Sequence, residues 1–551
     1  MKKNLIKITL FLIAFVLISC NKTNRVTKVP EENPTPTVEE TQSEPTPTPE
    51  PTDVEIPTET KETEIDVLEG YTPSESKYTF SSENLEKVNM NPTFDITQYT
   101  GNAGAAIQPY QLFADGMCLQ RDAVNHLWGI AYDTQHIAIK INNKVYYGTV
   151  ENDEWHVYLP MMNAGGPYKM EIITEVGTKV INDVYIGEVY LFAGQSNMEW
   201  QIWISGNKME SLYLDPNVKN DKIRLLHIAS PTSNPKNDPS LLLASPITWK
   251  GAEKESVRTF SAIAYVFGKK LQEELDCPVG LISTALGGTI IEHWLSESNY
   301  ELVSQRYKPI IDSKQYTQTP SIGYNGVLYP LKGYTMRGVV WYQGCANTFG
   351  TEVYYNLPLE TFIKQCREDY NNENLTFTLC ELARYMQDPM AYSTINEKLH
   401  AVAKRDERVV VIRNLDLGNW FDIHPVEKRD IGTRAIDETL RVFFNKDFAA
   451  PVTVESYKFN EDGTVTIVLS KNVELRNGTN GFEVYDGKNY TYDCNVTVNG
   501  NVLTVSADFV IKRVRYGYTC EMTNEIKNDV SKMVTVYDLN GMPLDLFHIK
   551  Y

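Results

Sequence analysis

The stretch from residue 184 to residue 200 constrains the fold of this chain more than any other. Residues 184–193 form an apolar, β-branched and aromatic run that is typical of a buried strand. The run ends at Gly194-Gln-Ser-Asn-Met198, where small polar side chains follow a glycine. Open α/β folds bind ligands beyond the carboxyl ends of their strands, so Ser196 lies at the edge of the sheet where a substrate would bind. Ser196 and Glu199 also fit the S-x-x-E pattern of a helix capping box, which would give the serine a structural role only.

The N-terminus predicts export and a lipid anchor. Three lysines precede an apolar run from Ile8 to Ile18, which is too short to span a bilayer. The run ends in Leu17-Ile-Ser-Cys20, which resembles a bacterial lipoprotein signal with Cys20 as the lipidated residue. A plain secretory signal with an incidental cysteine is the alternative. We therefore expect an extracytoplasmic protein, lipid-anchored at the bacterial cell surface or at the periplasmic face of a membrane.

Residues 21–75 have the composition of a disordered stalk. The segment is rich in Pro, Thr and Glu, and between Glu31 and Glu69 it carries thirteen acidic residues and one lysine. Such a segment cannot bury a core, and its prolines favour extended conformations. It accounts for much of the net charge of −19. This acidic balance argues against nucleic acid as a partner, since phosphate binding needs basic patches.

The rest of the chain changes its hydrophobic pattern twice, which predicts three folded domains. Residues 76–183 alternate in short strands with turn residues between them, as in an N-terminal β-sandwich domain. Residues 184–445 alternate strands with helices, which predicts an α/β domain whose parallel sheet has helices on both faces. Residues 446–551 return to a strand pattern and form the expected C-terminal β domain. Residues 1–20 are the signal peptide.

Within the α/β segment, individual elements can be placed from periodicity. Apolar residues at helical spacing predict a helix between Val257 and Leu275. Further apolar runs, each short enough for a strand, lie at residues 278–283, 338–342, 375–382 and 409–412.

Four segments of this domain share one pattern, a strand followed by glycine and small polar residues. They are residues 194–196, 285–289, 343–347 and 419–425. Strand ends of a parallel sheet converge on one edge, so these segments bring together a hydroxyl, an imidazole, a carboxylate, backbone amides and a carboxamide. Acyl transfer needs this set of groups. Serine is a weak nucleophile until a base takes its proton, and the oxyanion that forms on the substrate needs hydrogen-bond donors.

These motifs together resemble the sialate O-acetylesterase-like family of the SGNH (GDSL-like) hydrolase superfamily. The resemblance extends from about residue 105 to residue 445. The segments that carry it are Leu112–Met117, Leu119–Asp122, Met162–Tyr168, Gly194–Met198, Gly287–Trp294, Val340–Gly344 with Asn347, and Asp422–Pro425. The resemblance implies an SGNH-type, flavodoxin-like parallel sheet and no metal or organic cofactor.

The resemblance also implies roles for single residues. Ser196 is the implied nucleophile and His424 the general base, with Asp422 as the acid that orients His424. The implied oxyanion hole consists of Ser196, Gly287 and Asn347. Supporting or substrate-binding positions are Gln195, Gly288, Gln343 and Glu292.

Two positions depart from the family pattern. Cys345-Ala346 stands where the family usually has Glu-Ser, which removes a carboxylate beside Asn347. Many SGNH enzymes carry their acid three residues before the histidine, where this chain has Phe421. Asp422 is two residues before it, so Asp416 and a backbone carbonyl remain alternatives for orienting His424.

The cysteines after Cys20 are scattered and show no C-x-x-C spacing. Neither a zinc site nor a disulfide framework is indicated, although a Cys494–Cys520 bridge is possible in an oxidising compartment.

The sequence therefore predicts a serine carboxylesterase that removes O-acetyl groups from a glycan through an acetyl-serine intermediate. Sialic acid is the family's namesake substrate, and acetylated xylan or another plant glycan is the alternative. A second alternative is a surface glycan-binding lipoprotein whose esterase site has decayed, which the change at Cys345-Ala346 motivates.

Overall fold

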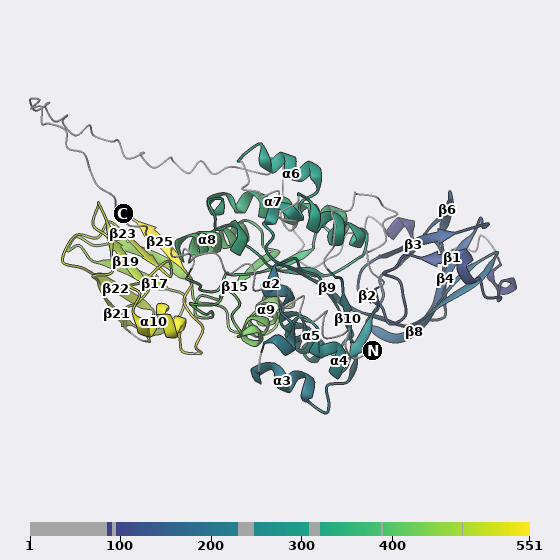
Figure 1. Ribbon diagram of the computed structural model, residues 1–551, viewed down its shortest axis with the longest axis horizontal. Coiled ribbons are helices and arrows are strands. Elements are labelled where there is room, and N and C mark those ends of the chain that lie inside the picture. The colour runs from purple at the N-terminus through teal and green to yellow at the C-terminus, as the bar shows by residue number, and fades with distance from the viewer. Residues whose placement is uncertain are drawn as a thin grey trace, which may run out of the picture. The chain divides into compact units, whose positions relative to one another are not determined.

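The computed structural model describes residues 85–90, 95–205, 207–229, 247–307, 320–386, 389–476 and 478–551 (Figure 1). The predicted signal peptide with Cys20 and the predicted stalk lie outside the described residues. The chain divides into two units at residue 66, and every element below belongs to the second unit.

The central sheet is built around strand β9 (Gly177–Gly194) (Figure 1). Its strand order is β11-β10-β12-β9-β13-β14-β15. The other strands are β10 (Asn220–His227), β11 (Lys250–Ala252), β12 (Val279–Ser283), β13 (Gly338–Tyr342), β14 (Thr376–Cys380) and β15 (Val409–Ile412). All neighbours pair in parallel except β10 and β11. Residues 184–194 of β9 are all buried, which explains why their sequence is apolar without alternation.

The chain reverses its direction of strand addition at β9. After β9 it adds β10 and β12 on one side, and then β13, β14 and β15 on the other. The crevice between β9 and β13 is therefore the topological switch point, where open α/β sheets place their ligands. Ser196 is the second residue after β9, and Gln343 is the first residue after β13.

Helices cover both faces of the central sheet (Figure 1). On one face α5 (Ala262–Leu275) packs against α9 (Lys428–Phe443), and on the other α7 (Asn356–Asp369) packs against α8 (Pro389–Arg405). The shorter helices are α2 (Ser196–Glu199), α3 (Asn207–Leu214), α4 (Lys254–Arg258), α6 (Glu297–Ser304) and α10 (Asn524–Asn528).

The helix predicted from Val257 to Leu275 is wrong as a single element. The chain forms α4 and then α5, because Ser261 has a non-helical backbone and caps α5 by accepting a hydrogen bond from the amide of Ala264.

Strand β9 also belongs to the N-terminal β region. Its first half pairs with β8 (Gly165–Thr174), and β2 (Cys118–Gln120) pairs with it in parallel. Strands β4 (Ile137–Ile141) and β5 (Lys144–Tyr147) extend this sheet, while a separate antiparallel sheet contains β1 (Ile107–Pro109), β3 (Asn125–Ala131), β7 (Glu154–Leu159) and β6 (Thr149–Glu151). One continuous strand thus passes through the predicted boundary at residues 183–184, and the division into domains stays a prediction.

The C-terminal region is antiparallel and has its own apolar core. One sheet contains β16 (Val454–Phe459), β17 (Val465–Leu469), β22 (Val502–Ser506) and β21 (Asn495–Asn499). A second contains β20 (Tyr490–Thr491), β19 (Phe482–Tyr485), β23 (Arg513–Tyr516) and β25 (Phe547–Lys550), and β18 (Val473–Leu475) pairs with β24 (Val536–Asp538). A mixed α/β sheet with partly parallel strands, accompanied by antiparallel β sheets, is therefore confirmed.

Two smaller findings concern the cysteines and the membrane. Cys494 and Cys520 are both free thiols, so the Cys494–Cys520 bridge considered from the sequence is not formed. Among the described helices, none combines the length and the apolar character that crossing a bilayer requires.

A buried carboxylate fixes β9 to its neighbours at the end of the sheet opposite Ser196. Glu188 is fully buried and accepts hydrogen bonds from Arg121 Nε at 2.6 Å and from Arg337 Nε at 2.9 Å. Burial raises the pKa of Glu188, but the charges of Arg337 and Arg121 outweigh it and lower the pKa to about 2. The ion pairs therefore stabilise the fold fully above the usual pKa of 4.5, and this contribution is lost as the pH falls toward 2.

We predict that Glu188→Gln lowers the free energy of unfolding by about 3–5 kcal/mol, because two partly buried guanidinium groups lose their counter-charge. Denaturant unfolding at neutral pH measures the loss. Glu455→Gln on β16 is the matched control, since Glu455 is exposed. Equal losses in the two variants would contradict this role of Glu188.

Candidate active site

Ser196 lies at the end of β9 because Gly194 allows a sharp turn there. Gly194 has φ +142°, and a β-carbon added to it would lie 2.2 Å from the carbonyl oxygen of Tyr342. Ser196 is the first residue of α2, whose N-cap is Gln195 without a side-chain capping bond. The capping-box interpretation is therefore wrong, since the Ser196 hydroxyl is hydrogen-bonded instead to His424 Nε2 at 2.8 Å.

His424 comes from the loop between β15 and α9, and its two ring nitrogens face different partners. Nε2 lies 2.8 Å from Ser196 Oγ, whereas Nδ1 lies 3.5 Å from Asp422 Oδ1. The same carboxylate oxygen accepts the backbone N–H of His424 at 2.8 Å. The indole of Trp200 stacks on the imidazole, with 4.5 Å between ring centroids and 18° between planes. The contacts hold the ring with Nε2 toward the serine.

The environment of His424 favours its neutral form. Burial lowers the pKa of His424 below 6.5, and the nearby charge of Lys428 lowers it further, while Asp422 raises it. A neutral imidazole with an acceptor nitrogen on a serine hydroxyl is the state that a general base requires.

Asp416, the alternative acid, is engaged elsewhere. Its two carboxylate oxygens accept from Arg434 NH1 at 2.6 Å and from Arg434 NH2 at 2.7 Å. Asp422 is the carboxylate that lies beside the ring of His424.

Gly287 lies directly beside Ser196. A β-carbon added at Gly287 would lie 3.6 Å from the Ser196 β-carbon, and no other atom would be as close. The amide of Leu286 donates to the Gly194 carbonyl at 2.9 Å, which ties this loop to the end of β9. Gly288 follows with φ +74°, a conformation that glycine adopts without strain.

Gln195 and Gln343 connect the strand ends. Both side-chain amides donate to the Thr289 carbonyl, from Gln195 at 2.8 Å and from Gln343 at 3.0 Å. Gln195 also accepts from the Gly344 amide at 2.9 Å. Through these bonds the two glutamines fix the loop that contains Gly287.

Asn347 is buried within the same network. Its Nδ2 donates to Glu292 Oε2 at 2.9 Å, and its Oδ1 accepts from the Ile291 amide at 3.0 Å and from Gln343 at 2.9 Å. Glu292 is fully buried, accepts from the Tyr307 hydroxyl, and has its pKa raised by burial. Among the described hydrogen bonds of Asn347 none reaches Ser196, so its place in the oxyanion hole stays a prediction.

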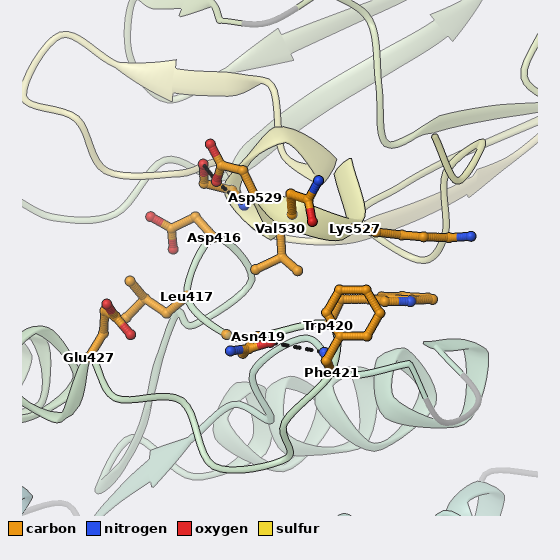
Figure 2. Close-up of a pocket in the computed structure, with 12 residues that line it drawn as sticks. Asp416, Leu417, Asn419, Trp420, Phe421, Glu427, Lys527, Asp529 and Val530 are labelled. Atoms are coloured by element: carbon orange, nitrogen blue, oxygen red, sulfur yellow. Dashed lines mark hydrogen bonds between the residues drawn. The ribbon is translucent and has the colours of Figure 1, made fainter. Parts of the chain in front are cut away.

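A cavity of about 450 Å³ adjoins the loop that contains His424 (Figure 2). Residues 416–421 line one side, and residues 527–531 of the C-terminal region line the other. Figure 2 shows Trp420 and Phe421 next to each other on its wall, with Phe421 62% exposed. Sequence reasoning named Phe421 only for its spacing and missed the cavity, because its two sides are far apart in the chain.

Sequence reasoning also missed Lys428. This lysine is fully buried and donates to Asn197, the neighbour of Ser196. Nothing in its local sequence separates it from the many exposed lysines.

One group of described side chains could hold a metal ion, namely Glu381, His400 and Asp545. His400 Nε2 lies 2.7 Å from Glu381 and 3.2 Å from Asp545, and Arg413 pairs with Asp545 at 2.6 Å. Burial lowers the pKa of His400, but the two carboxylates outweigh it and raise the pKa. A histidine whose pKa is raised and an arginine face the two carboxylates, which fits an ion-pair cluster better than a metal site.

The fold matches that of a carbohydrate-active esterase. A crystal structure of a novel carbohydrate acetylesterase from Xanthomonas citri superposes with a TM-score of 0.72 at 23% identity, covering 81% of this chain and 99% of that one. Residues 186–428 match the family of carbohydrate esterases described as sialic acid-specific acetylesterase. The resemblance inferred from the sequence is therefore confirmed for this segment.

Curated relatives have the corresponding name. Sialate O-acetylesterases of Pongo abelii and Homo sapiens are 27% and 26% identical to this chain over 290 residues. The match covers 49% of this chain and 54% of each relative, so the chain spans about half the length of the curated relatives it matches.

We predict that Gly194→Ala lowers the free energy of unfolding by more than ~1 kcal/mol. The added methyl group would clash with the Tyr342 carbonyl, and alanine rarely adopts the φ of this position. Gly287→Ala is the matched control, and its free energy of unfolding changes by less than about 1 kcal/mol. Thermal or denaturant unfolding compares them. A Gly194→Ala protein as stable as the control would refute the steric account of the turn.

Proposed function

We propose that this chain is a carbohydrate O-acetylesterase that uses Ser196 as its nucleophile. The observation that carries the proposal is the 2.8 Å hydrogen bond from Ser196 Oγ to His424 Nε2 at the switch point of the sheet. The match of residues 186–428 to a carbohydrate esterase family supports it. We assign the fold to the SGNH type, with a flavodoxin-like arrangement of its parallel strands.

The proposed reaction proceeds in two acyl transfers. Ser196 Oγ attacks the acetyl carbonyl while its proton passes to His424 Nε2, and Asp422 stabilises the imidazolium. The oxyanion accepts hydrogen bonds from the backbone amides of Ser196 and Gly287 and from Asn347, each such donor typically contributing about 3–4 kcal/mol. His424 returns the proton to the departing sugar hydroxyl, which leaves acetyl-Ser196. A water molecule, whose proton passes to His424, then attacks the acetyl carbonyl. The bond to Ser196 Oγ breaks, acetate leaves, and His424 returns the proton to the serine oxygen.

A glycan is the proposed carrier of the acetyl group. The cavity beside the His424 loop offers an exposed aromatic ring at Phe421 together with polar side chains such as Asn419 and Ser531, a combination suited to sugar rings and hydroxyls. Sialic acid and acetylated xylan both remain candidates. Acetate release from O-acetylated sialoglycans compared with acetylated xylan decides between these two classes.

A non-catalytic glycan-binding protein is the second candidate. The change at Cys345-Ala346 favours it, since the family carboxylate is absent there. The intact contacts of Ser196, His424 and Asp422 favour the enzyme.

We predict that the protein releases acetate from a small aryl acetate and that Ser196→Ala reduces the rate at least ~10³-fold, because the nucleophile is lost. Ser211→Ala is the control, since Ser211 is an exposed residue of α3. Absence of turnover by the wild-type protein at any pH would favour the binding protein instead.

We also propose that Cys20 carries a lipid that anchors the protein outside the cytoplasm. The full-length chain expressed in bacteria should partition with membranes, and Cys20→Ser should move it to the soluble fraction, because a lipid anchor needs the thiol. Cys494→Ser serves as control. Tight membrane association of the Cys20→Ser protein would refute lipidation at this position.

A further inference from the structure

Helix α9 begins with a lysine that has no access to solvent. Lys428 is 0% exposed, and its ammonium group donates to Asn197 Oδ1 at 2.7 Å and to the Pro425 carbonyl at 2.5 Å. The ammonium lies 5.6 Å from the ring centroid of Trp200. Burying a lysine costs considerable free energy, and neutral oxygens and an aromatic ring offset only part of that cost.

The partners of Lys428 flank the two residues of the proposed catalytic pair. Asn197 follows Ser196, and Pro425 follows His424. Asn197 Nδ2 in turn donates to the Ile423 carbonyl at 3.1 Å, on the other side of His424. The carbonyls on both sides of His424 are therefore tied to the turn that contains Ser196, one through Asn197 and the other through Lys428.

The same lysine influences the face of the imidazole. Trp200 stacks on His424 at 4.5 Å and also faces the ammonium of Lys428. Lys428 thus connects to the catalytic histidine through its flanking backbone and through the ring packed on it. Each of these contacts restricts the position of Nε2 relative to the serine hydroxyl.

We propose that Lys428 is the positioning residue of this site, which holds His424 on Ser196 through Asn197, Pro425 and Trp200 and keeps the imidazole neutral by its charge. The proposal rests on the proposed function, because it assigns a task to a residue of the same site. It is distinct from catalysis itself, since Lys428 is buried behind the pair and does not contact the reacting atoms.

The charges around Lys428 set the direction of the expected pH effect. Burial lowers the pKa of Lys428 to about 7, although the nearby groups of Cys345, Asp422, Glu427 and Cys380 act to raise it. Burial also raises the pKa of Cys345 to about 11, so this thiol is neutral and supplies no counter-charge. Below pH ~7 Lys428 is charged and lowers the pKa of His424. Removing the charge therefore raises the pKa of His424, and the acidic limb of any rate that needs neutral His424 moves to higher pH.

The experiment follows the reaction of Ser196 with an alkyl fluorophosphonate, which needs no knowledge of the natural substrate. Ser196 Oγ forms a bond to phosphorus, fluoride leaves, and His424 takes the serine proton. The labelling rate is measured from pH 4.5 to 8.5 for the full chain and for two variants. Lys428→Met removes both the charge and the donors, whereas Lys428→Gln removes the charge and keeps two N–H groups.

For Lys428→Met we expect labelling about 10–100-fold slower at the optimum, because a small displacement of a base costs about this much. We expect the acidic limb to move to higher pH in both variants, since both lose the charge, with a smaller rate loss in Lys428→Gln. Arg429→Met, an exposed cation one residue further along α9, should match the wild type. Thermal unfolding checks that each variant is folded, and Lys428→Gln provides the test where Lys428→Met does not fold.

The outcomes separate this proposal from the proposed function. Wild-type rates and an unmoved acidic limb in both Lys428 variants overturn the role of Lys428 while leaving the esterase intact. A loss of rate with no movement of the limb overturns the electrostatic part and reduces Lys428 to a packing residue. If Ser196 of the wild-type protein is not labelled at any pH, no activated serine exists and both proposals fall.

Discussion

The parallel pairing of β9 on both of its edges is the constraint on which the remaining structure depends. Because β12 and β13 flank β9 and its residues 184–194 are buried on both faces, the register of the strand and the position of its last residue are fixed. Its end is fixed by Gly194 against the Tyr342 carbonyl. The position of Ser196 is therefore a consequence of sheet packing. The buried ion pairs of Glu188 hold the same strand at the opposite edge of the central parallel region, six residues before Gly194.

Around this fixed serine the site is assembled by hydrogen bonds between loops rather than by regular structure. Gln195 and Gln343 both donate to the Thr289 carbonyl and thereby locate Gly287 beside Ser196. Asn197 and Lys428 hold the other side, where His424 enters. The electrostatic setting of His424 is a balance. Burial and Lys428 lower its pKa, and Asp422 raises it.

The predictable features were those encoded by local pattern. The strands expected at residues 338–342 and 409–412 are β13 and β15, because short runs buried on both faces are apolar throughout. The family resemblance held because its motifs follow strand ends in a fixed order. Where the prediction was wrong, a side-chain hydrogen bond outweighed the pattern. Ser261 interrupts the helix expected over residues 257–275 by capping α5, and Ser196 bonds to a distant imidazole instead of capping α2.

The sequence by itself determined the order of strands and helices, the strand-end motifs and the identity of Ser196 and His424 as candidates, since each depends on nearby residues. Only the tertiary structure decided which long-range partners those residues have. The partner of Nδ1 is Asp422, whereas Asp416 pairs with Arg434, a choice that depends on loop geometry. The burial of Lys428 depends on Trp200, Asn197 and Pro425 meeting from two segments. Burial and distance arise from packing between segments remote in the chain, which no local pattern contains.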